Sequence, residues 1–404
     1  MYSPTYEEIK RLAADTSIRV VPVSRELYAD GFTPIGVLRI LKNVSSHCYL
    51  LESVEDSEKW GRYTFLGYDP RLCLTCKNGR LTIQNHTAVT ETVSHPAEAI
   101  RHILRENKSP RFKDLPPFTG GLVGYFSFDY IQYSEPTLQL DAEDTEAFQD
   151  VDLMLFDKVI AFDNLRQKII LIANMRLADG EAGYNRALLE LEQMAALLKS
   201  GKPAPNLPAR LLTPFTPRFS QDAYCAMVER AKRYIFEGDI FQVVLSNRLE
   251  AEFEGSLLDA YRMLRTTNPS PYMFYFTSDE IELAGTSPET LVKLEDGVLH
   301  TFPLAGTRPR GKTPEEDAAL EKELLADEKE LAEHNMLVDL GRNDIGRISR
   351  FGTVEVERYQ SIERFSHVMH IGSTVRGVLR EDRDAVDAVD AILPAGTLSG
   401  APKL

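Results

Sequence analysis

Cysteine, tryptophan and histidine are scarce in this chain. Among 404 residues there are four Cys, one Trp and eight His. Four scattered cysteines are too few for a disulfide scaffold, and the histidines do not cluster at metal-binding spacing. Cys73 and Cys76 have the spacing of a redox or zinc pair, but no second Cys or His pair accompanies them. Residues 71–83 around them alternate like a strand with a turn at Asn78-Gly79, so we expect neither redox nor metal chemistry there.

Long apolar runs and an excess of positive charge are missing as well. No segment approaches the roughly 18 apolar residues of a membrane helix, and residues 1–10 lack the layout of a secretion signal. The chain has 46 Lys and Arg against 61 Asp and Glu, a formal net charge of -15. Nucleic acid requires clustered positive charge, so we do not expect nucleic acid as a partner. The missing apolar run and secretion signal lead us to expect no membrane partner and a cytoplasmic location. A content of 43% hydrophobic and 26% charged residues is that of a globular protein with one large or two medium cores.

A turn followed by a Glu-rich helix carries the most chemical information. The turn is Pro303–Arg310, and Thr313–Glu316 predicts a helix start with Thr as N-cap, Pro at the first position and Glu closing a capping box. We expect this helix to run to about Asp339. Glu330 and Glu333, three residues apart, then share one face and suit Mg2+ better than Zn2+. The alternative is a solvated helix face with ion pairs between residues four apart.

The end of this helix favours the metal-site interpretation. Its apolar stripe gives way to residues 340–346, where we expect a tight polar turn that brings Arg342, Asn343 and Asp344 together. A solvated helix does not need such a group. The pattern therefore indicates a dianionic substrate held through a metal, beside an anion-binding turn.

The chain divides into two halves at a proline-rich segment. Five prolines within residues 200–217 indicate a boundary loop, so we expect an N-terminal region 1–199, a linker 200–217 and a catalytic region 218–404. The fold class that we predict is α+β, a two-sheet antiparallel sandwich with outer helices. In the first half, the patterns predict strands at 48–52, 64–67, 122–128, 159–162 and 169–174, and helices at 97–106 and 183–199.

The second half is expected to group its strands and its helices. Ser220 is a predicted N-cap for a helix to Glu237, followed by a turn at Gly238-Asp239 and a strand Ile240–Arg248. Four further strand patterns indicate an antiparallel meander. They lie at 272–278, 281–286, 291–294 and 298–303.

Nine segments in this order resemble the chorismate-utilising enzymes, and within them the large subunits of anthranilate synthase. They are Leu50–Ser53, Gly120–Tyr125, Gly238–Ser246, Asn268–Met273, Gly285–Glu289, Pro303–Arg310, Lys329–His334, Ser366–His370 and Gly396–Lys403. Each is weak alone, but nine in order exclude chance similarity. The family's fold agrees with the sandwich predicted above.

The resemblance implies conversion of chorismate and ammonia to anthranilate and pyruvate, with Mg2+ as cofactor. Glu330 and Glu333 match the metal-binding helix, with Glu333 as direct ligand. Glu289 matches the general acid, a role that requires a pocket shielding the carboxyl from water. His370, ahead of His367, matches the histidine associated with pyruvate elimination. Apart from the resemblance, Glu289 is typical of a surface turn and His370 of a core strand.

The resemblance also implies a substrate-binding turn at Gly306 and Thr307, and a second such loop that contains Thr397. Ala305 stands where aminodeoxychorismate synthases typically carry a nucleophilic Lys, which a methyl group cannot replace. Gln242 stands where isochorismate and salicylate synthases typically carry a Lys that activates water; an amide is no such base but can hydrogen-bond ammonia. Both favour anthranilate synthase. An enzyme that stops at aminodeoxyisochorismate is the alternative.

Two segments resemble the family's pocket for feedback inhibition by tryptophan. Glu52 is expected to receive the amino acid's ammonium group and Ser53 to hydrogen-bond it. Pro271, Tyr272 and Met273 are expected to line an apolar slot for the indole ring. The alternative is a buried strand end and a Pro-rich turn.

Partners are implied in the same way. Family members take ammonia from a glutamine amidotransferase subunit, component II, and no Cys/His/Glu glutaminase arrangement is visible here, so we expect a heteromer. The family's pattern continues past Leu404 into further strands with a second metal-ligating Glu, so we expect a C-terminally truncated sheet. The other hypothesis is an inactive fragment that acts only as a tryptophan- or partner-binding module.

Overall fold

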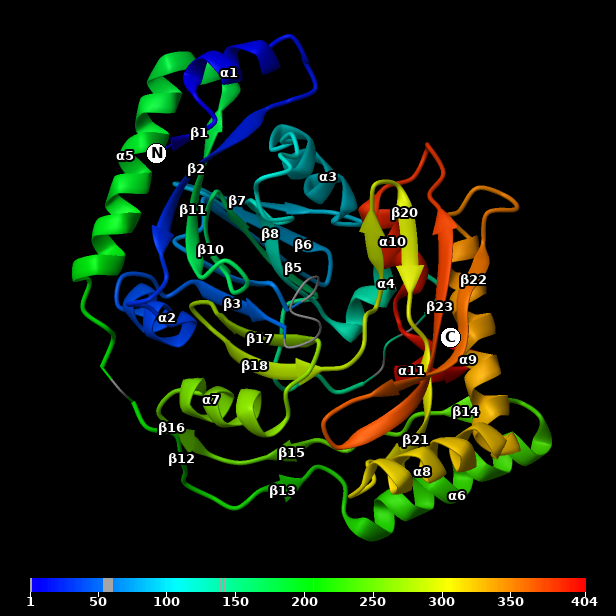
Figure 1. Ribbon diagram of the computed structural model, residues 1–404. Helices are drawn as coiled ribbons and strands as arrows, with labels where there is room; N and C mark the ends of the chain where they lie inside the picture. The colour runs from blue at the N-terminus through cyan, green and yellow to red at the C-terminus, as the bar shows by residue number, and fades with distance from the viewer. Residues whose placement is uncertain (1, 54–60, 139, 141, 206) are drawn as a thin grey trace. The chain divides into compact units, whose positions relative to one another are not determined.

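The computed structural model describes residues 2–53, 61–138, 140, 142–205 and 207–404 (Figure 1). The chain forms two compact units, Met1–Ala209 with Gly255–Ser287, and Arg210–Glu254 with Pro288–Leu404. Residues 255–287 belong to the first unit because strand β17 pairs with strand β3. The compact units therefore differ from two consecutive regions separated at residues 200–217, because residues 255–287 return to the first unit. The division into functional regions stays a prediction.

An eight-stranded antiparallel sheet forms the centre of the first unit. Its order is β1-β2-β11-β10-β4-β3-β17-β18. Strands β10 and β11 are nearly continuous apolar runs and are buried on both faces, as central strands require. The bounds are β1 (Tyr2–Ser3), β2 (Val20–Tyr28), β3 (Cys48–Glu52), β4 (Tyr63–Tyr68), β10 (Lys158–Asp163), β11 (Lys168–Arg176), β17 (Tyr272–Thr277) and β18 (Glu282–Ser287).

A five-stranded antiparallel sheet packs on one face of the first sheet. Its order is β7-β6-β5-β9-β8, and the predicted turn at Asn78-Gly79 joins β5 to β6. Tyr49 and Phe156, one from each sheet, meet edge to face with ring centroids 4.7 Å apart. The strands are β5 (Leu72–Lys77), β6 (Arg80–Gln84), β7 (Ala88–Thr92), β8 (Gly121–Phe126) and β9 (Val151–Phe156).

Helices cover the other face of the eight-stranded sheet. Ile9, Leu38, Leu191 and Tyr261, from α1, α2, α5 and α7, belong to one buried cluster with the strands. The predicted antiparallel sandwich with outer helices is therefore confirmed. The elements predicted in the first half are present, although the strand expected over 122–128 ends at Phe126 and Phe128 begins a 3-10 turn. The helices of this unit are α1 (Tyr6–Leu12), α2 (Pro34–Lys42), α3 (Ala97–Glu106), α4 (Ile131–Ser134), α5 (Gly180–Ser200) and α7 (Leu258–Thr267), with 3-10 turns at Phe128–Tyr130 and Leu177–Asp179.

The second unit is built around the long strand β23. Strand β22 pairs along one edge, and β20 and β21 pair in succession along the other. Helices α8 and α9 pack on this sheet, where Val338 joins a core with Val375, and Leu324 one with Met369. Its strands are β19 (Lys293–Glu295), β20 (Val298–Thr301), β21 (Leu304–Pro309), β22 (Glu355–Arg364) and β23 (Val368–Val378).

The remaining elements of this unit are helices and short strand pairs. The helices are α6 (Gln221–Glu237), α8 (Pro314–Ala326), α9 (Glu328–Gly346), α10 (Ala385–Ile392) and α11 (Gly396–Ser399). The strand pairs are β12 (Arg210–Leu211) with β16 (Phe253–Glu254), β13 (Thr216–Pro217) with β15 (Leu249–Glu250), and β14 (Gln242–Val243) with β24 (Gly400–Ala401). In the part of the chain that the structure describes, every helix is too short or too polar to cross a bilayer.

The helix predicted to run to about Asp339 is in fact two helices. Asp327 separates α8 from α9 with an extended backbone (φ -81°, ψ 103°), and its carboxylate accepts hydrogen bonds from the amides of Lys329 and Glu330. It therefore caps the second helix. Because α9 continues to Gly346, residues 340–346 are helical and the polar turn predicted there was wrong.

Both predicted N-caps are confirmed, while the predicted capping box is wrong. Ser220 caps α6 and Thr313 caps α8. The carboxylate of Glu316 accepts a hydrogen bond from the amide of Lys312, one residue before the cap, in place of the amide of Thr313.

Two strand predictions in the second half were wrong. Within the strand expected over Ile240–Arg248, only β14 pairs, and its partner is β24. The next strand, β15, begins at Leu249 and pairs with β13. The expected single meander is split, since β17 and β18 complete the eight-stranded sheet whereas β19 and β20 belong to the second unit. Pro288, which has no amide hydrogen to donate, follows β18.

Candidate active site

A histidine and a threonine face each other on strands β21 and β23. Thr307 lies opposite His370, and the register shifts just before it, between Ala305 and Thr307. The Nδ1 atom of His370 is 3.0 Å from the Thr307 hydroxyl and 3.1 Å from the carbonyl oxygen of Gly306. A carbonyl only accepts, so this contact requires the proton on Nδ1. In the neutral ring Nε2 then carries the lone pair that can take a proton.

The turn at Gly306 is shaped by its backbone. Gly306 has φ +76°, a conformation that favours glycine. A Cβ there would also lie 3.1 Å from the side chain of Ile371. The turn leaves Thr307 exposed beside a half-buried His370, while Ala305 before it is buried with only its methyl group as side chain. The structure thus brings together four of the predicted site residues, Ala305, Gly306, Thr307 and His370.

Helix α9 carries Glu330 and Glu333, and an arginine fixes its first turn. Arg308 in β21 pairs with Asp327, the cap of α9, at 2.8 Å, and lies 3.9 Å from Glu330. Arg308 also pairs with Glu323 at 2.9 Å. The partner of Glu330 therefore comes from the neighbouring strand and not from the helix itself. This contact orients the helix start toward the turn at Gly306.

Gln242 contacts the second of these carboxylates. Its Nε2 donates to Glu333 Oε1 at 3.4 Å, and its Oε1 is buried without a hydrogen-bond partner among the described residues. Strand β14 brings it there by pairing with β24, where Gly400 has φ +147° and a Cβ would lie 2.3 Å from the Gln242 carbonyl oxygen. A glycine is therefore required for this close approach. Thr397 is half-buried and lies in the short helix α11, just before Gly400. The open loop that the sequence predicted there is therefore helical.

The donor set on α9 suits a hard cation with open coordination positions. Within the described ranges, no three His, Cys, Asp or Glu side chains lie close enough together to hold a metal by themselves. Mg2+ commonly keeps several waters and uses only one or two protein carboxylates. Glu330 and Glu333 fit that pattern, while a closed structural site of the Zn2+ type does not.

Glu289 lies in the connection from β18 to β19 and is half-buried. His367 is exposed and lies one residue before β23, whereas His370 is inside that strand. The catalytic assignment of Glu289 and His370 stays a prediction.

Sequence reasoning missed a buried polar contact beneath the helix carboxylates. His334, 0% exposed, has its Nε2 2.7 Å from the hydroxyl of Ser373 in β23. Burial lowers the pKa of His334 to about 4, so the ring is neutral. Further along α9, Asp344 pairs with Lys403 at 2.7 Å, and burial raises the pKa of Asp344 despite this partner. The first contact ties α9 to strand β23, and the second ties it to Lys403, which follows β24. The only sequence signal for His334 was its place next to Glu333.

The proposed effector segment lies in the first unit, at the end of strand β3. Glu52 is 7% exposed and faces Met273 across the β3–β17 pair. Its carboxylate accepts from the Tyr261 hydroxyl at 2.8 Å and from Arg265 at 2.8 and 2.6 Å, a two-point ion pair. Burial first, and then the Glu52 charge, raises the pKa of Tyr261. Residues four apart share a helix face, which is the signal that Tyr261 and Arg265 act together.

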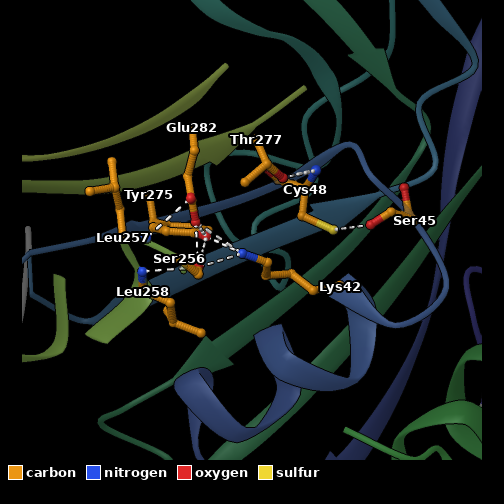
Figure 2. Close-up of polar contacts among 9 residues, drawn as sticks. All are labelled: Lys42, Ser45, Cys48, Ser256, Leu257, Leu258, Tyr275, Thr277 and Glu282. Carbon is orange, nitrogen blue, oxygen red and sulfur yellow. Dashed lines mark hydrogen bonds and ion pairs between the residues drawn. The ribbon is translucent and has the colours of Figure 1, made fainter. Parts of the chain in front are cut away.

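A second polar cluster holds the start of the same helix, α7 (Figure 2). Lys42 of α2 is 3.0 Å from Glu282 and 3.1 Å from the Ser256 hydroxyl, and Tyr275 also hydrogen-bonds Glu282. The other Glu282 oxygen accepts from the Leu257 amide at 3.1 Å. The helix is therefore tied to the sheet at its beginning as well as at Arg265.

The second unit thus carries the His370–Thr307 pair on its antiparallel sheet, with the acidic helix α9 packed on that sheet. A family described as chorismate binding enzyme matches residues 47–404, and the chain belongs to this family. The protein is thus an enzyme of the chorismate-binding class.

Its similarity within the class is to anthranilate synthase component 1. The chain is 44% identical to that protein of Acetivibrio thermocellus, over 100% of this chain and 83% of the other. It matches the crystal structure of anthranilate synthase component I from Streptococcus pneumoniae with TM-score 0.74 and 37% identity, over 87% of this chain and 76% of that one. The menaquinone-specific isochorismate synthase of Escherichia coli matches with TM-score 0.64 and 19% identity, over 98% and 80%, and shows the fold alone.

Proposed function

We propose that this chain is the chorismate-converting subunit of an anthranilate synthase. The overall change is chorismate plus ammonia to anthranilate, pyruvate and water. The contact of Gln242 with Glu333 carries the proposal, because it sets an amide, which cannot activate water, beside the acidic helix. The buried methyl group of Ala305 offers no nucleophile to the ring. Similarity to anthranilate synthase component 1 along the whole chain supports the same choice.

Binding of the substrate's carboxylates is assigned to the turn and the helix. Glu330 and Glu333 would hold Mg2+, which supplies positive charge to a substrate carboxylate when bound. The Thr307 hydroxyl and the amides at Gly306 donate hydrogen bonds to carboxylate oxygens. Thr397 adds a further hydroxyl donor from α11.

Proton transfers are assigned to Glu289 and His370. Glu289 gives a proton to the ring hydroxyl, which leaves as water while ammonia, hydrogen-bonded by Gln242, forms the new C–N bond. His370 Nε2 then removes the proton from the carbon that bears the amino group. The C–O bond to the enolpyruvyl group breaks, the ring becomes aromatic, and the enolate leaves and is protonated to pyruvate. The hydrogen bond from Nδ1 to Gly306 keeps Nε2 in the accepting form.

Ammonia supply and inhibition complete the proposal. A glutamine amidotransferase subunit would supply ammonia, so the working enzyme is a heteromer. L-Tryptophan would place its ammonium at Glu52 and Ser53 and its ring against Pro271, Tyr272 and Met273, of which Pro271 and Met273 are buried. The ammonium would compete with Arg265 for the Glu52 carboxylate, so tryptophan binding would weaken the Glu52–Arg265 ion pair. A Ser53→Phe variant that kept full tryptophan inhibition would contradict this assignment.

The test is product identification with the purified chain. It is incubated with chorismate, Mg2+ and excess ammonium, and the products are separated and identified by fluorescence and mass. Anthranilate is the expected product with ammonium, and not with glutamine until a glutaminase subunit is added. Isochorismate as the main product, or an aminated intermediate without pyruvate, would overturn the proposal.

A further inference from the structure

A polar cavity of about 480 Å3 opens between the two sheets of the first unit. It lies at the end of the β3–β17 pair opposite to Glu52, since the cavity is lined by residues around His47 and Asp279. Its volume is within the range of small-molecule sites. The effector segment and the candidate active site use none of its lining residues, so it calls for an explanation of its own.

One carboxylate in this cavity has no partner among the described residues. Asp152 in β9 lines the cavity and is only 5% exposed. Its side chain has no hydrogen bond or ion pair with any residue that the structure describes. Thr75 lies directly opposite Asp152 and shares its face of the sheet, so the carboxylate and this hydroxyl point the same way, into the cavity. A buried charge without a partner is costly to the folded state.

The other acidic groups of the cavity are already engaged. Asp279 accepts from the Ser46 hydroxyl at 2.7 Å and lies 3.5 Å from His47 Nε2. Asp69 pairs with Lys158 at 2.6 Å. The remaining carboxylate, Glu280, is exposed at the β17–β18 turn, and its charge adds to the burial that raises the pKa of Asp152 to about 6. The unmet negative charge is therefore at Asp152, with Glu280 near it.

The positive groups at the cavity do not meet this need. His47 faces Asp279. The pKa of Arg71 is lowered by burial and by the charge of Arg176, and the carboxylates that raise it are Asp157, Asp179 and Glu190. Asp152 is not among the principal causes of this shift. The group that Asp152 lacks must therefore come from outside the described chain.

The segment that carries Ser45, one of the lining residues of the cavity, is held by hydrogen bonds (Figure 2). The Thr277 hydroxyl accepts from the Cys48 amide at 3.1 Å, and the Cys48 thiol donates to the Ser45 carbonyl at 3.5 Å. These contacts fix the segment that leads into β3, including Ser45 at the cavity edge. A ligand would not have to order this segment, so little binding free energy is lost on ordering it.

We propose that the cavity binds a small organic cation whose primary ammonium group hydrogen-bonds Asp152, with Glu280 as its second carboxylate. A metal ion fits less well, because the described residues supply no group of three suitable ligands. An ammonium needs only acceptors around it, and the Thr75 hydroxyl and the Gln84 and Gln149 amides of the lining can supply them. A site of this kind lies beyond the proposed reaction and its tryptophan inhibition.

The test is calorimetric titration of the full chain with the diamine putrescine, at about pH 8, where Asp152 is ionised. The diol of equal chain length is the uncharged control. We expect saturable binding of putrescine and none of the diol. Asp152→Asn should bind at least about tenfold more weakly, as expected for a lost charge-assisted hydrogen bond. Asp30→Asn removes the same charge from an exposed turn in the same unit and should bind within about twofold of the unchanged chain.

A milder variant keeps the test decisive if Asp152→Asn does not fold. Glu280→Gln changes only an exposed turn residue and should weaken binding by about threefold. No saturable binding of putrescine up to roughly 10 mM, equal binding of the diol, or undiminished binding by Asp152→Asn would each overturn the proposal. Because no chorismate is present, none of these outcomes bears on the proposed reaction.

Discussion

The two candidate ligand regions differ in how their polar groups are satisfied. In the second unit, Gln242 keeps a buried oxygen without a partner in the described chain, and His370 holds its Nδ1 proton on a carbonyl so that Nε2 can accept. In the first unit, Glu52 is saturated by Tyr261 and Arg265. Catalysis needs side chains with unused bonding capacity. Regulation can use a group whose existing partners exchange for a ligand.

The largest effect is expected at the acidic helix. Glu333→Gln removes the charge that faces Gln242 and the proposed cation, and should lower kcat/KM by about 100-fold or more. Glu328→Gln on the same helix is the matched control, since Glu328 is exposed in the first turn. It should stay within about twofold of the unchanged chain. The activity of both variants is measured as the initial rate of anthranilate formation, followed by fluorescence. Equal rates for the two variants would contradict a role for Glu333 in the active site.

A large effect is also expected at the histidine. His370→Asn removes the base for the final elimination, so kcat should fall by about 100-fold or more, as for loss of a general base. The aminated intermediate should accumulate without pyruvate, which chromatography with mass detection can follow. His367→Asn changes an exposed neighbour and should leave the product ratio unaltered. Loss of both products together would assign His370 to binding instead.

A moderate effect on stability is expected at the saturated pair. Glu52→Gln leaves Arg265 partly buried without its carboxylate and should lower the free energy of unfolding by about 1–3 kcal/mol. Glu26→Gln breaks a pair with Lys168 that is much more exposed and should cost less than about 0.5 kcal/mol. Urea denaturation measures both values. Glu52→Gln should also abolish tryptophan inhibition while ammonium-dependent turnover persists; intact inhibition would contradict the assigned pocket.

The smallest expected effect is a pH dependence in the first unit. The pKa of Asp152 is raised to about 6, so between about pH 4 and pH 6 the folded chain binds more protons there than the unfolded chain. The contribution of Asp152 to the free energy of unfolding should therefore fall as pH rises through this window, by about 2–3 kcal/mol at most. Asp152→Asn should be more stable than the unchanged chain at pH 8, and the difference should vanish near pH 4. Thermal unfolding at both pH values checks it, and a variant less stable at pH 8 would contradict this account.

Local patterns predicted much of this architecture because they depend on neighbouring residues. Ser220 and Thr313 cap their helices where the sequence indicates, and strand β3 has its predicted bounds. Apolar alternation cannot say which sheet a strand joins, so it missed that β18 and β19 belong to different units. Asp327 was missed as a break because its capping bonds lie inside an otherwise helical pattern.

The candidate site was predictable in kind but not in its contacts. Glu330, Glu333, Thr307 and His370 were named from motifs, and the structure places Thr307 beside His370 through strand pairing. The partners Arg308, Arg265 and Tyr261 were missed. The spacing of Tyr261 and Arg265 puts them on one helix face, but it does not show that the distant Glu52 meets them. His334 was seen only as a neighbour of Glu333, although its burial anchors the helix.

We propose that the second unit performs amination and elimination on chorismate. The most direct measurement is the molar ratio of pyruvate to anthranilate formed by the chain with chorismate, ammonium and Mg2+. We expect equal amounts throughout the time course, with both lowered by about 100-fold or more in Glu333→Gln. Chorismate consumed without pyruvate, or pyruvate formed without anthranilate, would contradict it.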